Sequence, residues 1–247
     1  RDYYASRGLG DVYKRQDYNS MKTTDIKNVN LTNFMTQDSI RVFEQWTKFY
    51  TVFSFDQTFD AFSRFRTGEM PLVVQPYTFY NQLSVAAPEI KGLWDFTLVP
   101  GTKQADGTIN HAANSAGSGA VIFNKVSNQA AAWDFVKWFT STDIQVDYGK
   151  QIEALMGPMG RFDTANVEAL EQLPWSTAEY EKISSQQSYL REVPIIPASY
   201  AVTRHINNAF RMVVNDAGNP RYTLMSYNDQ IKSEIVRKYQ ELSSVKK

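Results

Sequence analysis

The segment 62–123 constrains the fold of this chain most, because it alternates short apolar runs with Gly and Pro. Apolar runs at 72–75, 94–99 and 120–123 are each bounded by Gly or Pro, which predicts short buried strands of an α/β sheet rather than solvent-facing hairpins. The loop that follows the first run begins at Pro76 and is rich in aromatic residues. Strands that deliver such a loop suit binding a ligand better than transforming one.

Helical periodicity is plain in several other segments, where apolar residues recur at i, i+3 and i+4 or a capping signal opens the run. The expected helices are one through Ile40 to Tyr50 after the capping candidates Thr36 and Asp38, one over 132–139 behind Asn128, one from Thr142 to Gly149, one over 164–172, one from Ser176 to about Leu190, one from about Val202 to Gly218, and one that begins at Asn219-Pro220. Thr142 with Gln145 and Ser176 with Glu179 each predict a capping box. The segment 103–114 is expected to be an exposed loop.

The composition gives no support for several classes of partner and excludes all cysteine-dependent sites. Lys plus Arg and Asp plus Glu number 26 each, so the formal net charge is zero, whereas nucleic acid and anionic membranes favour a strongly basic face. The chain has no cysteine, which excludes disulfides, thiolate metal sites and thiol nucleophiles. Its 14 Tyr, 15 Phe and 5 Trp accompany a negative mean hydropathy, so many rings are expected at the surface or along a cleft.

No sequence motif indicates an enzyme or a cofactor. Asp95, Glu153 and Glu69 supply carboxylates of the kind a glycosidase pairs, but no motif brings two of them together. His111 and His205 lack companions at metal-ligand spacing, which argues against a metal site or an activated nucleophile. We therefore expect no catalytic residue, no metal and no cofactor, and we interpret His205 as structural.

The first sixteen residues are set apart from the rest. Residues 11–16 can be back-translated as GAT-GTG-TAT-AAG-AGA-CAG, which resembles a transposon-end adapter of sequencing libraries. We interpret residues 1–16 as a translated artefact and exclude them from the fold, the alternative being a natural, disordered basic start.

Several short tracts follow one another in a fixed order. They are Gly68-Glu69-Met70, Gln75-Pro76-Tyr77, Val99-Pro100-Gly101, Gly117-Ser118-Gly119, Ala132-Trp133-Asp134-Phe135, Met156-Gly157-Pro158 and Pro197-Ala198-Ser199-Tyr200. In this order they resemble the C-terminal half of an extracellular solute-binding protein of a sugar-type ABC transporter, over about residues 17–247.

The resemblance implies a periplasmic-binding-protein-like type II fold of two lobes, here N-terminally truncated and helix-rich. It assigns residues 17–112 and 164–247 to the C-terminal lobe and residues 113–163 to the N-terminal lobe. Three strands cannot provide the sheets of two lobes, which also favours truncation. Such a protein is expected to bind a carbohydrate between its lobes as a monomer.

The family also implies partners and a location. The sugar would be delivered to the transmembrane permease subunits of an ABC importer from an extracytoplasmic position, with membrane attachment only through a lipid anchor upstream. The alternatives are a sugar sensor or surface adhesin without a transport role, and a degenerate glycosidase.

The loop 76–81 carries the main binding hypothesis. A pyranose has C–H-rich faces and hydroxyl-rich edges, so its receptor needs flat rings and hydrogen-bonding groups. Tyr77 supplies such a ring, and the resemblance implies that Tyr80 and Asn81 reach ligand hydroxyls. The competing interpretation is that Phe79 and Tyr80 pack the core of the lobe, and for Phe79 we prefer it.

Four further candidates come from other segments. Tyr200 and Arg204 are four residues apart at the start of a helix, so they share one face, where the resemblance implies a stacking ring and a clamp for a hydroxyl or carboxylate. Arg204 has an alternative as a surface ion pair with Glu192 or Asp216. Met156 and Gly157 form a turn that could contact the ligand, or a turn with a core plug.

The remaining candidate is Ser118, in the tract that begins the strand crossing between the lobes. The glycines around Ser118 suit a hinge, and its hydroxyl could contact the ligand.

Overall fold

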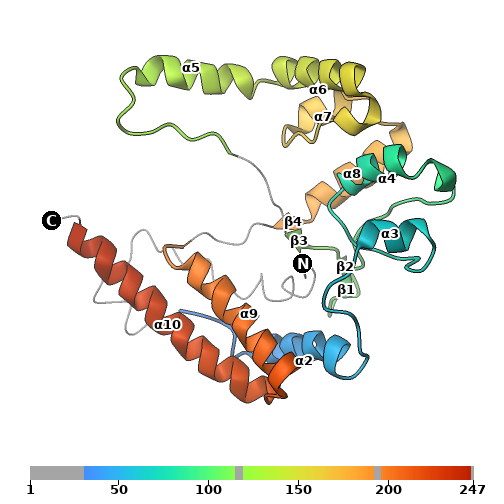
Figure 1. Ribbon diagram of the computed structural model, residues 1–247. Coiled ribbons are helices and arrows are strands. Elements are labelled where there is room, and N and C mark those ends of the chain that lie inside the picture. Colours follow the sequence, from blue (N-terminus) through green and yellow to red (C-terminus); the bar gives the residue numbers. More distant parts are fainter. Residues whose placement is uncertain (1–30, 115–118, 192–195, 246–247) are drawn as a thin grey trace. The chain divides into compact units, whose positions relative to one another are not determined.

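A computed structural model of the protein describes residues 31–114, 119–191 and 196–245 (Figure 1). They form two compact units. Unit 1 contains the described residues up to Phe59 together with those from 196 onward, and unit 2 spans Asp60–Arg191. The chain therefore passes from one unit to the other twice.

The described residues of unit 1 form the helices α2 (Gln37–Thr51), α9 (Ser199–Asp216) and α10 (Pro220–Val245). Figure 1 shows α9 and α10 side by side. The turn between them is short because Ala217 adopts the left-handed conformation at φ 54°, and the Gly218 amide donates to the Met212 carbonyl at 3.0 Å. A connection of this length makes α9 and α10 antiparallel neighbours.

The apolar faces of these three helices form the core of unit 1. Trp46 of α2 stacks on Phe210 of α9 with ring centroids 4.4 Å apart, and Tyr50 meets the same ring edge-on at 5.0 Å. The residues buried around them include Phe43, Val202, Ile206, Leu224, Ile231 and Ile235. The spacing predicted from the sequence for α2, α9 and α10 is therefore confirmed in their packing.

Unit 2 combines short helices with very little sheet. Its elements are α3 (Ala61–Arg66), α4 (Phe79–Ala86), the 3₁₀ helix η2 (Pro88–Ile90), β1 (Thr102–Lys103), β2 (Ile109–Asn110), β3 (Ala113–Asn114), α5 (Gln129–Phe139), α6 (Thr142–Met156), the 3₁₀ helix η3 (Gly157–Gly160), α7 (Val167–Gln172), α8 (Thr177–Ser188) and β4 (Leu190–Arg191). β1 and β2 pair antiparallel, and β3 pairs parallel with β4. Leu170, Leu173 and Ile183 form a small hydrophobic core in this unit.

The three predicted strands at 72–75, 94–99 and 120–123 are wrong, because the structure leaves all three without regular secondary structure. A strand needs a neighbouring strand for its backbone groups. No described segment pairs with these runs, and the Val99 amide instead donates to the side chain of Gln186 at 2.9 Å. Leu72 is 87% exposed, so the first run is not buried either.

The predicted loop at 103–114 is corrected as well. It contains β2, β3 and the end of β1, and the β1–β2 hairpin turns at Gly107, whose φ is +87°. Most of its residues are exposed, as expected.

Several of the helices predicted for unit 2 are confirmed, whereas none of the predicted strands is. Asn128 caps α5 through a bond from the Ala131 amide, and Ser176 with Glu179 forms the expected capping box of α8. The predicted capping box at Thr142 is wrong, because Ser141 is the N-cap residue of α6 and makes no side-chain cap bond. α6 also continues through Gly149 to Met156 instead of ending there. Helices α3 and α4 were not predicted.

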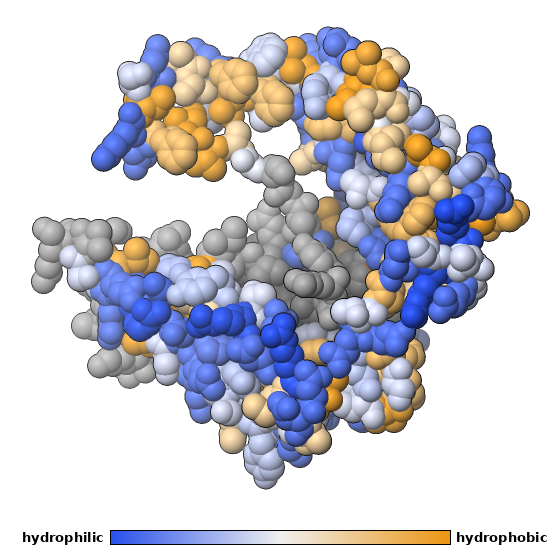
Figure 2. Space-filling view, in the orientation of Figure 1, coloured by the Kyte–Doolittle hydropathy of each residue, from blue (hydrophilic) through white to orange (hydrophobic). Residues whose placement is uncertain are grey.

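The amphipathic helix α5 is present, but its apolar face is not buried. Trp133, Phe135 and Trp138 are each more than half exposed, and none of its residues is buried. Figure 2 shows hydrophobic residues gathered on the surface over α5. The periodicity predicted the helix, whereas its burial requires a partner that the described residues do not provide.

Candidate functional site

The candidate site in unit 2 is organised by the start of α4. Phe79 donates to the Pro76 carbonyl and Tyr80 to the Tyr77 carbonyl, both at 2.9 Å, so the predicted aromatic loop winds directly into the helix. Tyr80 and Asn81 consequently lie in the first turn of α4 rather than in a loop. Phe79 meets Phe62 and Phe65 edge-on, which agrees with a packing role.

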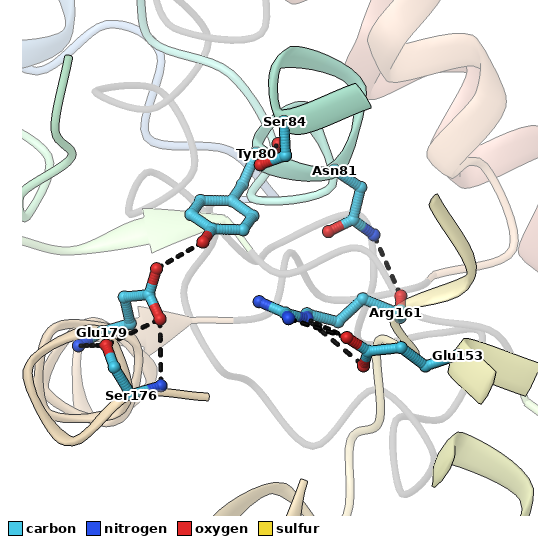
Figure 3. Close-up of polar contacts among 7 residues, drawn as sticks. All are labelled: Tyr80, Asn81, Ser84, Glu153, Arg161, Ser176 and Glu179. Carbon is cyan, nitrogen blue, oxygen red and sulfur yellow. Dashed lines mark hydrogen bonds and ion pairs between the residues drawn. The ribbon is translucent and has the colours of Figure 1, made fainter. Parts of the chain in front are cut away.

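Tyr80 is surrounded by aromatic rings. Its ring lies 5.4 Å from Trp94, 5.8 Å from Phe96 and 5.2 Å from Trp175, measured between centroids. Its hydroxyl donates to Glu179 of α8, as Figure 3 shows. Burial and the Glu179 carboxylate raise the pKa of Tyr80, so the phenol stays protonated as a donor.

Glu179 holds two elements together through one carboxylate. One oxygen accepts the Tyr80 hydroxyl, and the other accepts the Ser176 amide at 2.9 Å and the Ser176 hydroxyl at 2.7 Å (Figure 3). Burial by itself would raise the pKa of Glu179, because it disfavours the charged carboxylate. These hydrogen bonds stabilise the carboxylate by more, so the pKa of Glu179 is lowered. The capping box of α8 thus also fixes the position of the Tyr80 ring.

A partly buried ion pair lies beside these rings. The Arg161 guanidinium donates to Glu153 from two nitrogens, at 2.7 Å and 3.1 Å, and the two side chains are only 12% and 15% exposed (Figure 3). The guanidinium lies 4.6 Å from the Trp175 ring centroid and 5.5 Å from that of Tyr80. Burial by itself would lower the pKa of Arg161, because it disfavours the charged guanidinium. The hydrogen bonds and the negative charge of Glu153 have the larger effect, so the pKa of Arg161 is raised.

Asn81 connects α4 to the segment that carries Arg161. Its Nδ2 donates to the Arg161 carbonyl oxygen at 2.9 Å (Figure 3), and the residue is 5% exposed. Its Oδ1 is buried and accepts no hydrogen bond from the described residues. The amide therefore has one free acceptor inside the cluster.

Tyr77 reaches the same group of rings from the turn before α4. Its ring meets Trp175 edge-on with centroids 5.8 Å apart, and its hydroxyl is buried. Burial, followed by the nearby Asp163 carboxylate, raises the pKa of Tyr77, although no hydrogen bond of good geometry joins the two groups. Burial likewise raises the pKa of Asp163.

Three buried polar atoms in this cluster lack a partner among the described residues: Tyr77 Oη, Asn81 Oδ1 and Trp175 Nε1. Buried polar groups in proteins are nearly always hydrogen-bonded to protein, water or a ligand. Two donors and one acceptor in a cluster of five aromatic rings can serve a hydroxyl-bearing molecule, because a hydroxyl both donates and accepts.

Met156 and Gly157 lie at the junction of α6 and η3 in the same unit. Gly157 has φ +66°, a conformation that favours glycine, and a Cβ placed there would meet no atom within 4 Å. The turn therefore explains why residue 157 is a glycine. Met156 is 59% exposed, so its side chain is accessible to a ligand. Ser118 lies outside the described residues.

Tyr200 and Arg204 belong to unit 1. They lie on one face of α9 as the spacing predicts, with the guanidinium 5.8 Å from the Tyr200 ring centroid. Arg204 forms no ion pair with Asp216 among the described residues, and Glu192 lies outside them. His205 is 8% exposed and faces Tyr227, which agrees with a structural role, yet neither of its ring nitrogens has a partner in the described chain.

The structure thus brings Tyr77, Tyr80 and Asn81 into one cluster, and it adds residues that the sequence analysis did not single out for binding. Arg161, Trp175 and Glu179 come from separate segments, and only the capping box of α8 could have indicated one of them. Within the described ranges, no group of His, Asp or Glu side chains could hold a metal ion. No helix built from those residues combines the length and apolarity needed to cross a membrane.

Comparison with protein families gives a match. The sequence profile of a family described as bacterial extracellular solute-binding protein matches residues 7–173, which is more than half of the chain. No curated protein matches the sequence.

Proposed function

This chain belongs to the bacterial extracellular solute-binding proteins, and on that premise we propose that it binds a carbohydrate and delivers it to the permease of an ABC importer. Membership implies a periplasmic-binding-protein-like fold, an extracytoplasmic location and a small-molecule ligand. Proteins of this family generally bind their ligands without catalysis.

The observation that supports a carbohydrate is the cluster around Tyr80 and Trp175. It combines aromatic rings with three buried polar atoms that lack partners, and these are the two kinds of group that a sugar requires. Leaving a buried donor or acceptor unpaired costs about 1–3 kcal/mol, so a hydroxyl that satisfies it gains affinity and selectivity.

The proposed binding residues are Tyr77, Tyr80, Asn81, Ser118, Met156, Gly157, Tyr200 and Arg204. The proposed lobes are 17–112 with 164–247, and 113–163. A ligand that contacts both lobes only in a closed form would shift the equilibrium toward closure by its difference in affinity for the two forms. The permease would recognise the closed form, and the protein would act as a lipid-anchored monomer.

The test is isothermal calorimetry with a panel of mono- and oligosaccharides, after a thermal-shift screen. Tyr77→Ala should weaken binding of the tightest sugar about tenfold or more, because it removes a ring and a donor from the cluster. Tyr222→Ala, at a position 68% exposed on α10, is the matched control and should bind normally. Equal affinity of the two variants would remove Tyr77 from the site.

The same panel separates the alternatives. Release of shorter sugars during the assay would indicate a glycosidase. Tight binding without uptake in cells that carry the permease would indicate a sensor or adhesin.

A further inference from the structure

An exposed tyrosine ring at the start of α9 is surrounded by cationic side chains. The Tyr200 ring is 53% exposed, with Arg204 at 5.8 Å and the Lys238 ammonium at 5.9 Å from its centroid. Arg237 of α10 is close enough to interact electrostatically with the Tyr200 hydroxyl. The sequence alone does not predict this arrangement, because Tyr200 and Lys238 come together only through the antiparallel packing of α9 and α10.

The charges around this ring do not cancel. Glu234 accepts from Arg237 at 2.7 Å, and Glu241 accepts from Lys238 at 2.7 Å as well as from Arg237. Three cations and two carboxylates leave a net charge of +1 around the ring. Arg204 is the cation of this group that makes no ion pair or hydrogen bond with the described residues.

A hydrogen-bonding pocket adjoins the cationic group on the same pair of helices. It has a volume of about 340 Å³ and is lined by His205, Asp229, Gln230, Ser233 and Glu234. Glu234 links the two, because it lines the pocket and also interacts with Arg204. The pocket supplies amide, hydroxyl and carboxylate groups that can bind sugar hydroxyls.

We propose that Tyr200, Arg204 and Lys238 bind a sugar unit that carries a carboxylate, so that the solute is an acidic carbohydrate such as a uronic acid. This inference rests on the proposed function and specifies its ligand. The Tyr200 ring stacks against the C–H face of the pyranose. The planar guanidinium of Arg204 binds the carboxylate through two parallel hydrogen bonds, and Lys238 adds a second positive charge.

The chemistry distinguishes acidic from neutral sugars. A neutral sugar makes the stacking contact but no charge-assisted hydrogen bond with Arg204. The guanidinium then stays hydrated, so it contributes nothing to the affinity for the neutral sugar. A uronate gains charge-assisted hydrogen bonds, which are about twice as strong as neutral ones. We therefore expect a uronate to bind at least about tenfold more tightly than the corresponding neutral sugar.

The experiment is calorimetry of the protein with galacturonic acid and with galactose, which differ at C6. Arg204→Gln and Lys238→Gln remove one cation each, and Arg211→Gln removes an exposed cation of α9 that has no part in the group. Circular dichroism and thermal unfolding confirm that each variant is folded. Arg204→Gln should lose about tenfold in affinity for galacturonic acid, Lys238→Gln severalfold, and Arg211→Gln nothing.

Two results would overturn the acidic ligand while leaving the proposed function intact. One is galactose binding as tightly as galacturonic acid with no effect of Arg204→Gln. The other is competition by inorganic phosphate as effective as that by galacturonic acid, which would indicate a general anion site. If no sugar of any kind binds, the proposed carbohydrate function fails together with this inference.

Discussion

At the scale of single residues, the ion pair between Glu153 and Arg161 is the most constrained polar contact of the candidate site. Its two side chains are largely buried, and the guanidinium lies 4.6 Å from the Trp175 ring centroid and 5.5 Å from that of Tyr80. Removing one partner of such a pair leaves an uncompensated charge away from water, which costs more than the pair itself contributes.

Glu153→Gln should therefore destabilise the protein by about 3 kcal/mol, at the lower end of the range for fully buried pairs. Urea denaturation monitored by tryptophan fluorescence measures the free energy of unfolding. Asp38→Asn, which breaks the exposed pair with Arg41, should change it by less than about 0.5 kcal/mol. A Glu153→Gln protein as stable as the Asp38→Asn protein would show that the pair is solvated.

His205 makes stability depend on pH. Burial lowers its pKa, the Arg204 charge lowers it further, and Glu234 opposes them. Asp229 lines the same pocket, and Tyr227 faces the ring. Because the unfolded chain has the ordinary pKa of about 6.5, it binds the proton first as the pH falls. The stability contributed by neutral His205 is thus present above about pH 6.5 and is lost as the pH falls through the lowered pKa of the folded state.

We expect wild-type protein to lose unfolding free energy between pH 7.5 and 5.5, and His205→Gln to lose distinctly less over the same range. Urea denaturation at several pH values in this window provides the measurement. At pH 7.5 the two proteins need not be equally stable, so the slope with pH is the quantity compared. Parallel slopes would mean that His205 is not the titrating group.

At the scale of secondary-structure elements, local signals such as apolar periodicity and caps explain why most helices could be predicted and the strands could not. A cap is local: Thr36, Asn128 and Ser176 each bond to an amide three residues ahead, so the signal lies within one turn. A strand at 72–75 or 120–123 depends on a partner elsewhere in the chain, and the apolar run does not reveal whether one exists.

The capping box of α8 gives a prediction at this scale. Ser176→Ala should destabilise the protein by about 1 kcal/mol, because the side chain accepts the Glu179 amide and no other group replaces it. Ser185→Ala, at an exposed position within α8, should be neutral or slightly stabilising, since alanine favours helices. Equal urea midpoints for the two variants would contradict a stabilising role of the cap.

The candidate site was predictable only in part, for the same reason. Tyr77, Tyr80 and Asn81 are neighbours in sequence, so one aromatic loop indicated all three as candidates. Arg161 and Trp175 join them through folding of separate segments, and nothing in the sequence links these residues to α4. The pairing of Tyr200 with Arg204 followed from helical spacing, whereas that of Tyr200 with Lys238 required the packing of α9 on α10.

At the scale of the whole molecule, the proposed mechanism links ligand binding to closure of the two proposed lobes. Met156 and Gly157 lie in the proposed lobe 113–163, whereas Tyr77, Tyr80 and Tyr200 lie in the other proposed lobe, formed by 17–112 and 164–247. A solute that contacts both lobes only in a closed form would shift the equilibrium toward closure, so ligand binding and closure should be thermodynamically linked.

This linkage can be measured through the distance between the two proposed lobes. The chain has no cysteine, so Lys150→Cys in the proposed lobe 113–163 and Ser226→Cys in the other proposed lobe, both exposed, can be spin-labelled without interference. Pulsed electron spin resonance should show that a saturating sugar narrows the distance distribution and shifts its mean. Labels at Gln45 and Ser226, both in unit 1, should give the same distances with and without ligand. A shift from 1% to 99% of the closed form requires about 5.5 kcal/mol of differential affinity, so a weakly selective ligand would shift it only partly. An unchanged distribution for the first label pair, at a sugar concentration that calorimetry shows to be saturating, would exclude closure between the proposed lobes as the binding mechanism.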